Sequence, residues 1–462
     1  MRISRFLHLY SFALILLMFY KVLTGEYNLS SNNDIYLIII ISIIYSFFNL
    51  YYFKYNSFIN FICYYNYYIN FLTPFVFIIF FEETIFKILN KYQFLEYGFF
   101  KIFLTVAMFS FFANYIFSKI KSQKNVTENL NRRINLNFIR WIFFFLIANI
   151  LFTSLQLPFY NYFYGFFNPQ LHLLFFIYIY MVSDSKNKLK SYLIPFLIIY
   201  VIYTVITGSR GGLFHVLLYS LLVLFYVKGD FILSFKRFFS ISIFLFIGLI
   251  TYPIATIFRI INNSSGVSDF SFDILFDSYS VTNNYFIFML SAIVERLSLL
   301  QYSFYLSNDL YNPFFFKQYF TFNEFFNSSI NLTFPLDYNS NSIPSNTYLR
   351  TLVDDSNYFD LKYDWSSFNA YIVDFNHLYN SSFSFIISII TILIYSLICK
   401  LFNRKSLLLQ LIYVFLILNI INFFVFFGYD YMFKHIVHSI FGILLLWSIF
   451  SLSNFNNKKN KL

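Results

Sequence analysis

The stretch Tyr200–Gly229, YVIYTVITGSRGGLFHVLLYSLLVLFYVKG, decides the fold class of this chain. Two long apolar blocks are separated by a short turn of small residues that contains one fixed positive charge, Arg210. Arginine keeps its proton in a protein, so this charge is costly unless it meets water or an anion. The stretch therefore predicts two adjacent membrane-spanning helices joined by a tight turn that carries a charge.

The composition of the whole chain extends this interpretation. Of 462 residues, 59% are hydrophobic, 25% are aromatic and only 11% are charged, whereas soluble domains usually contain about 25% charged residues. The apolar residues come in solid blocks without alternation, which disfavours an outer-membrane barrel. The sequence therefore predicts an all-α, polytopic integral membrane protein.

Counting apolar blocks of about 20 residues predicts about twelve transmembrane helices. We expect nine in residues 1–258, a large extracytoplasmic loop with short helices in 259–376, and three more helices in 377–462. The first block has no small-residue cleavage site and is expected to be an uncleaved span. The sixth and eighth blocks are short, and Pro74 is expected to kink the third. The predicted spans are 6–24, 34–53, 58–81, 97–118, 139–158, 167–183, 191–207, 212–227, 238–258, 380–399, 407–427 and 435–452.

The basic residues predict the orientation. With the N-terminus in the cytoplasm, 21 of the 32 Lys and Arg residues fall on cytoplasmic segments, as the positive-inside rule requires if both termini are cytoplasmic. The same rule explains the net charge of +11 better than nucleic-acid binding does, so no nucleic-acid partner is expected.

Few basic residues remain on the predicted outer side, and three arginines among them are candidate site residues. Arg210 lies in the TGSRGG turn, where glycines let an anion approach the backbone and a guanidinium matches phosphate oxygens. Arg259 ends the ninth predicted span, and Arg296 lies on an apolar part of the large loop. The alternative for each arginine is an anchor at the membrane interface.

Asp374 and His377 stand near the outer end of the tenth predicted span, where either could accept a proton from an attacking hydroxyl. The alternative for both is a solvated loop. The sequence contains no Walker A motif, no H-E-x-x-H and no CxxC pair, and Cys63 and Cys399 lack metal-ligand spacing. We therefore expect no cofactor and no metal.

The twelve-span layout, the TGSRGGL turn and the single large outer loop together resemble the Wzy-type polymerases of O-antigen and capsular oligosaccharide repeat units. The end of the loop, SNTYLRTLVDD (345–355) followed by NAYIVDFNHLYNSSFSFII (369–387), is similar to the family pattern, although Asn376 replaces the family's glycine. The resemblance implies metal-independent glycosyl transfer between polyprenyl-diphosphate carriers at the outer face of the bacterial inner membrane.

The resemblance also implies roles for the candidate residues. Arg210, Arg259 and Arg296 would bind the diphosphate, with Arg210 and Arg296 also contacting the transition state, and Asp374 or His377 would be the base. The implied partners are the lipid-linked oligosaccharide and membrane lipid, with a chain-length regulator and a flippase as possible protein partners. The alternative functions are an O-antigen ligase, which shares the layout and the arginines, and a flippase or other transporter, which is expected to carry charges inside its spans.

Overall fold

The structure is a computed structural model that describes residues 2–25, 32–54, 57–80, 99–119, 136–154, 169–182, 190–206, 212–236, 238–243 and 246, and positions 393, 396–397, 437, 440–442, 444–445, 448–449 and 451. These residues are almost entirely helical, and the one β-bridge among them joins Arg2 to Ile232. The predicted all-α class is therefore confirmed for this part of the chain.

The helices follow the apolar blocks of the sequence. The first eight predicted spans each coincide with a described helix or continuous helical rod, with boundaries that differ by a few residues. In the part of the chain that the structure describes, two helices, Ile3–Thr24 and Asp34–Phe53, are long and apolar enough to cross a membrane, judged by length and composition alone. The elements are α1 (Ile3–Thr24), α2 (Asn32–Phe53), α3 (Ser57–Tyr64), η1 (Tyr65–Leu72), α4 (Thr73–Phe80), α6 (Phe99–Ser118), α7 (Leu136–Ser154), α9 (Pro169–Val182), α10 (Lys190–Ile206) and α11 (Gly212–Lys228).

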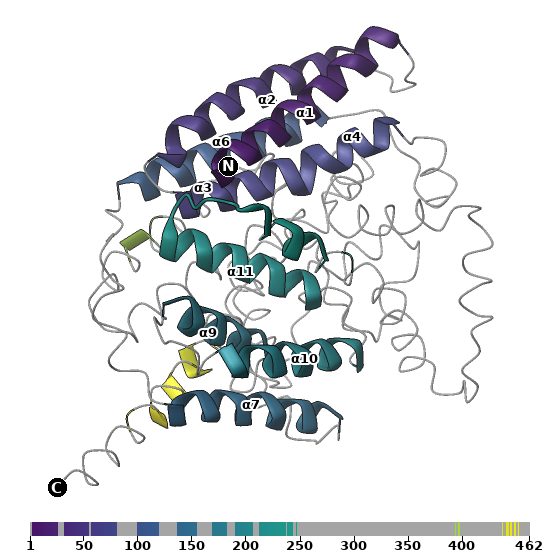
Figure 1. Cartoon of the computed structure of the whole chain (residues 1–462). Helices are drawn as coiled ribbons and strands as arrows, with labels where there is room; N and C mark the ends of the chain where they lie inside the picture. The colour runs from purple at the N-terminus through teal and green to yellow at the C-terminus, as the bar shows by residue number, and fades with distance from the viewer. Residues whose placement is uncertain are drawn as a thin grey trace, which may run out of the picture.

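The helices lie side by side as a stack of rods (Figure 1). α1, α2, α6 and the continuous rod α3–η1–α4 form one group. α11 packs against α3 on one side and α9 on the other, and α10 and α7 complete the described stack. α11 therefore connects the N-terminal group with the α7–α9–α10 group.

The residues before Pro74, where the sequence predicts a kink, form a π-helical segment. Pro74 has no N–H to donate to the preceding turn, and its ring crowds that turn. The residues before it, Tyr65–Leu72, form the wider π-helix η1. Both the backbone N–H and the side-chain hydroxyl of Thr73 donate to the carbonyl of Tyr68, five residues earlier, and the hydroxyl bond measures 2.7 Å. The helix thus continues through Pro74 with a changed register.

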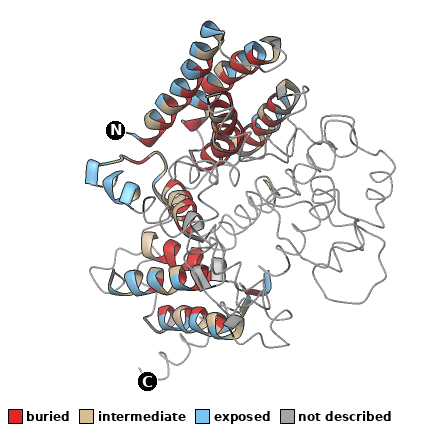
Figure 2. Cartoon of the chain, turned by 90° about the vertical axis from the view of Figure 1, so that its right-hand side faces the viewer, coloured by how far each residue is buried: buried red, intermediate tan, exposed pale blue. Residues whose placement is uncertain are grey.

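Burial divides the long helices such as α1, α2 and α7 lengthwise (Figure 2), whereas α3, η1 and α9 are buried on nearly all sides. Inward faces hold a single core of Ile, Leu, Phe and Tyr. Outward faces remain apolar, as the stripe Leu9, Leu16 and Leu23 on α1 illustrates with exposed fractions of 61%, 67% and 74%. Among the residues whose burial the structure describes, no Asp, Glu, Lys or Arg is buried. This arrangement of apolar outer faces and charge-free interior is unlike that of a soluble helical bundle, whose outer faces are polar.

The described helices have two distinct ends. The starts of α1 and α3 meet the ends of α2 and α11, as ring contacts show: His8 lies 5.6 Å from Phe53, and Phe58 lies 5.6 Å from Tyr226. We call this the basic end, because eight of the ten Lys and Arg residues in the described ranges lie there. They are Arg2, Arg5, Lys54, Lys119, Arg140, Lys190, Lys228 and Lys236.

The opposite end carries the other two described cations. Lys21, near the end of α1, lies over the ring of Phe80 at the end of α4, with 5.3 Å between Nζ and the ring centroid. Lys101 stands near the start of α6. The charge asymmetry along the rods is therefore strong.

Candidate functional site

The five residues that the sequence singled out lie outside the described residues. They are Arg210, Arg259, Arg296, Asp374 and His377. For Arg210 the neighbouring helices are defined, because α10 ends at Ile206 and α11 begins at Gly212. Arg210 thus belongs to the five residues of sequence that connect two apolar helices, and these two helices pack together.

The described residues contain a buried polar seam that sequence analysis did not single out. It links α2, α3, η1 and α6, and every member has an exposed fraction of 2% or less. Its side chains are hydroxyls and amides rather than charges. They are Ser42, Ser46, Asn49, Asn60, Tyr67, Tyr68 and Asn114.

The hydroxyl part of the seam joins α2 to η1. The Ser42 Oγ and the Tyr67 hydroxyl lie 2.9 Å apart, and Ser46 pairs with the Tyr68 hydroxyl. Tyr68 also donates to the Ser42 carbonyl at 3.2 Å, and Ser46 donates to the same carbonyl at 2.7 Å. The positions of Ser42, Ser46, Tyr67 and Tyr68 are therefore mutually determined.

The amide part of the seam joins α2, α3 and α6. Asn60 Nδ2 donates to the Asn49 carbonyl at 2.8 Å, and Asn114 Nδ2 donates to Asn60 Oδ1 at 3.1 Å. Asn60 thus uses its donor toward α2 and its acceptor toward α6. Because these bonds cross between apolar helices, they fix the helices in register.

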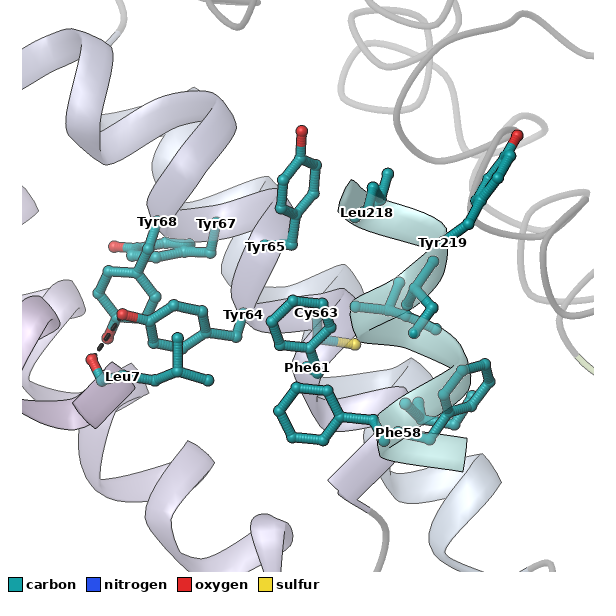
Figure 3. Packing of buried hydrophobic residues seen from close by; sticks show 14 of the residues in the cluster. Leu7, Phe58, Phe61, Cys63, Tyr64, Tyr65, Tyr67, Tyr68, Leu218 and Tyr219 are labelled. Carbon is teal, nitrogen blue, oxygen red and sulfur yellow. Dashed lines mark hydrogen bonds between the residues drawn. The ribbon is translucent and has the colours of Figure 1, made fainter. Parts of the chain in front are cut away.

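Tyrosines of η1 and its flanks complete the contacts of α1 (Figure 3). The Tyr64 hydroxyl donates to the Leu7 carbonyl at 2.6 Å, and Tyr10 pairs with Thr73 at 2.8 Å. Tyr64, Tyr67 and Tyr68 point to one side of the rod, while Tyr65 points away from them (Figure 3). Three tyrosines of the rod therefore contact α1 and α2 from one side, alongside the contacts of Asn60 and Thr73.

A second polar contact, the clasp, closes the basic end. It consists of residues 2–4 and 230–232. The Ile3 N–H donates to the Phe231 carbonyl at 3.0 Å, next to the bridge between Arg2 and Ile232. Asp230 accepts two bonds from Ser4, from its N–H at 3.1 Å and from its hydroxyl at 2.7 Å.

The clasp supplies the N-terminal cap of α1. Arg2, the residue at the cap position, makes no side-chain capping bond, so the Asp230 carboxylate fills this role, 226 residues after Ser4 in the sequence. Gly229 turns the chain from α11 into the clasp with a φ of 63°, a conformation that costs little only for glycine. The clasp therefore holds the start of α1 against the end of α11.

The seam and the clasp hold helices together and do not contain groups arranged for catalysis. The seam contains no carboxylate and no histidine, and the carboxylate of the clasp is engaged by Ser4. Across the described ranges, no group of three or more His, Cys, Asp or Glu residues could hold a metal ion. The described helices thus form a scaffold, and the predicted catalytic groups belong to other segments of the sequence.

Part of the seam has a signal in the sequence. Ser42, Ser46 and Asn49 follow a spacing of four and three residues inside an apolar block, which places them on one helix face. Asn60 and Asn114 likewise lie within apolar blocks. Polar side chains inside a predicted span require partners, so the pattern predicts bonds between helices without naming the partners.

Comparison of the chain with protein-family models, with curated proteins and with solved structures found no match.

Proposed function

We propose that this chain is an integral membrane glycosyltransferase that polymerises polyprenyl-diphosphate-linked oligosaccharide repeat units into O-antigen or capsular polysaccharide. In this proposal the chain crosses the bacterial inner membrane about twelve times, with both termini in the cytoplasm. Three features support it in turn: the lipid-compatible surface of the helices, the distribution of their basic residues, and the position of Arg210 in the sequence between α10 and α11.

The outer surface of the described helices supports placement in a membrane. Large apolar side chains are exposed at helical spacing, as Tyr36, Ile40, Ile44, Phe47 and Tyr51 are on α2. Large exposed apolar surfaces mark contact with lipid or with other proteins. At 1.5 Å per residue, the 22 residues of α1 extend roughly 33 Å, enough for a hydrocarbon core of about 30 Å.

The basic end supports the proposed orientation. The eight cations gathered there obey the positive-inside rule if this end faces the cytoplasm. α10 begins at this end with Lys190, and α11 finishes there with Lys228. The helix ends that flank Arg210 in the sequence, Ile206 and Gly212, then belong to the outer side.

The single observation that supports the proposed reaction is the connection between α10 and α11. Arg210 occupies a five-residue link between two apolar helices, at the end of those helices where the described ranges hold few cations. A cation retained there against the positive-inside bias needs an anionic partner. The diphosphate of a lipid-linked glycan is such a partner, and a guanidinium can bind it through two parallel hydrogen bonds.

In the proposed reaction, a hydroxyl oxygen of one lipid-linked repeat unit attacks the anomeric carbon of the growing chain. The bond between that carbon and the phosphate oxygen breaks, and the diphosphate leaves with the electron pair. Asp374 or His377 takes the hydroxyl proton. Arg210, Arg259 and Arg296 stabilise the charge that develops on the leaving diphosphate.

The test is replacement of Arg210 in a strain whose own copy is deleted. Arg210→Ala should abolish polymer and leave single-repeat glycan, while the protein level in the membrane stays unchanged. Arg210→Lys keeps the charge and loses the two-point contact, so it should restore only part of the polymer. Polymer of normal length in the Arg210→Ala strain would reject the proposal. Accumulation of free lipid-linked polymer would instead identify a ligase.

A further inference from the structure

The basic end carries a cluster of cations that the proposed reaction does not use. Arg2 and Arg5 come from the start of α1, and Lys228 and Lys236 come from the end of α11 and the segment after it. All four side chains are exposed. Arg2, Arg5, Lys228 and Lys236 are called the basic cluster below.

The clasp brings the two halves of the basic cluster together. The bridge between Arg2 and Ile232 sets the start of α1 beside residues 230–232, and the rings of Phe6 and Phe238, 6.2 Å apart, extend this contact to the segment that carries Lys236. Residues more than 220 positions apart in the sequence thus form one surface.

The basic cluster has no anionic partner within the described residues. Asp34 and Asp230 are the two acidic residues in the described ranges, and Asp34 lies at the opposite end, at the start of α2. The carboxylate oxygens of Asp230 accept the two bonds from Ser4, and no ion pair links Asp230 to the four cations. The surface therefore presents four positive charges beside a single carboxylate that is already hydrogen-bonded.

Exposed aromatic rings border these charges. Phe235 is 84% exposed, and Phe238 is also exposed, on the segment that carries Lys236. Cations next to exposed apolar rings are typical of segments that lie in the interface of a membrane, where the rings enter the lipid and the cations meet the headgroups. The surface is therefore suited to an amphipathic anion rather than to a soluble one.

We infer that the basic cluster binds the headgroup of an anionic phospholipid of the cytoplasmic leaflet. Basic sites at the cytoplasmic ends of membrane helices bind cardiolipin, whose headgroup carries two phosphates. The cluster offers one pair of cations for each phosphate, Arg2 with Arg5 and Lys228 with Lys236. Phe235 and Phe238 would pack against the acyl chains. The inference rests on the membrane placement proposed above, but not on the proposed reaction.

The test measures cardiolipin binding to the detergent-purified full chain by native mass spectrometry, with phosphatidylcholine as the neutral comparison. Each cation near an anionic lipid contributes about a five-fold factor, so Lys228→Gln with Lys236→Gln should weaken cardiolipin binding about 30-fold. The matched control is Lys54→Gln with Lys119→Gln, which removes two exposed charges from the same end outside the cluster. This control should change binding less than about two-fold. Arg2→Gln with Arg5→Gln is an independent second variant and should match the first.

Equal weakening in the cluster variants and in the control would overturn the inference, because it would indicate a general effect of surface charge. Unchanged binding in both cluster variants, or equal binding of phosphatidylcholine, would also overturn it. Detergent-dependent extraction from cell membranes is measured first. If the chain requires detergent for extraction but binds no cardiolipin, this inference is refuted and the proposed membrane placement still stands. Polymer synthesis is not measured, so the result does not depend on the proposed reaction.

Discussion

Removal of the Asp230 carboxylate tests whether the clasp caps α1. Asp230→Ala deletes the acceptor of two bonds, from the Ser4 N–H at 3.1 Å and the Ser4 hydroxyl at 2.7 Å. Loss of an N-terminal cap costs about 1 kcal/mol. A hydroxyl bond to a charged acceptor contributes about 1.5–3 kcal/mol, and partial exposure to water lowers this value here to about 1 kcal/mol. Local opening of the start of α1 should therefore become easier by about 2 kcal/mol.

Hydrogen exchange is the appropriate assay, because it reports local opening rather than global unfolding. A loss of about 2 kcal/mol corresponds to exchange about 30-fold faster. This increase should appear at the Ile3, Ser4 and Phe6 amides, whose bonds all belong to the clasp or to the first turn of α1. The matched control is Asp34→Ala, which removes the other described acidic residue and should leave these amides unchanged.

Two further variants locate the effect at the Ser4–Asp230 contact. Asp230→Asn keeps one acceptor oxygen and should give about half the free-energy change. Ser4→Ala with Asp230→Ala should exchange no faster than Asp230→Ala alone, because the deleted hydroxyl has no remaining acceptor. Unchanged exchange in Asp230→Ala, or strictly additive effects of the two substitutions, would refute the capping argument.

Two other predictions concern the seam and the orientation. Asn60→Leu should lower the free energy of unfolding in a detergent titration by about 1–2 kcal/mol, because it leaves the Asn114 amide and the Asn49 carbonyl without their bonds. Asn60→Leu with Asn114→Leu should lose less than the sum of the single losses, whereas simple additivity would speak against a direct bond. For the orientation, single cysteines are placed at Thr24, Lys54 and Lys119 in a Cys63→Ala, Cys399→Ala background. A membrane-impermeant maleimide should label only the Thr24 position in spheroplasts, and labelling of Lys54 or Lys119 would contradict the proposed topology.

The rods were predictable because apolar block length is a direct property of the sequence. The eight blocks from residue 6 to residue 227 each correspond to a described helix or rod. The short sixth block corresponds to α9, whose 14 residues extend only roughly 21 Å. Pro74 correctly marked an irregularity, but the π-helical form depends on Thr73 and Tyr68, whose bond no composition rule anticipates.

The partners within the sites were much less predictable. The chain contains 42 tyrosines, so nothing in the composition distinguishes Tyr67 and Tyr68 as the partners of Ser42 and Ser46. The contact between Ser4 and Asp230 spans 226 residues and depends on how the rods pack, which periodicity does not encode. The predicted site residues Arg210, Arg259, Arg296, Asp374 and His377 stay predictions, because they lie outside the described residues.

The separation between the two halves of the clasp has a consequence for biosynthesis. Translation proceeds at about 5–20 residues per second, so Asp230 is made roughly 11–45 seconds after Ser4. During this interval the first turn of α1 has to satisfy its amides with water. In the topology proposed above, the N-terminal helix would therefore enter the bilayer with a frayed start, and that start would become ordered only after α11 had been made and packed beside it.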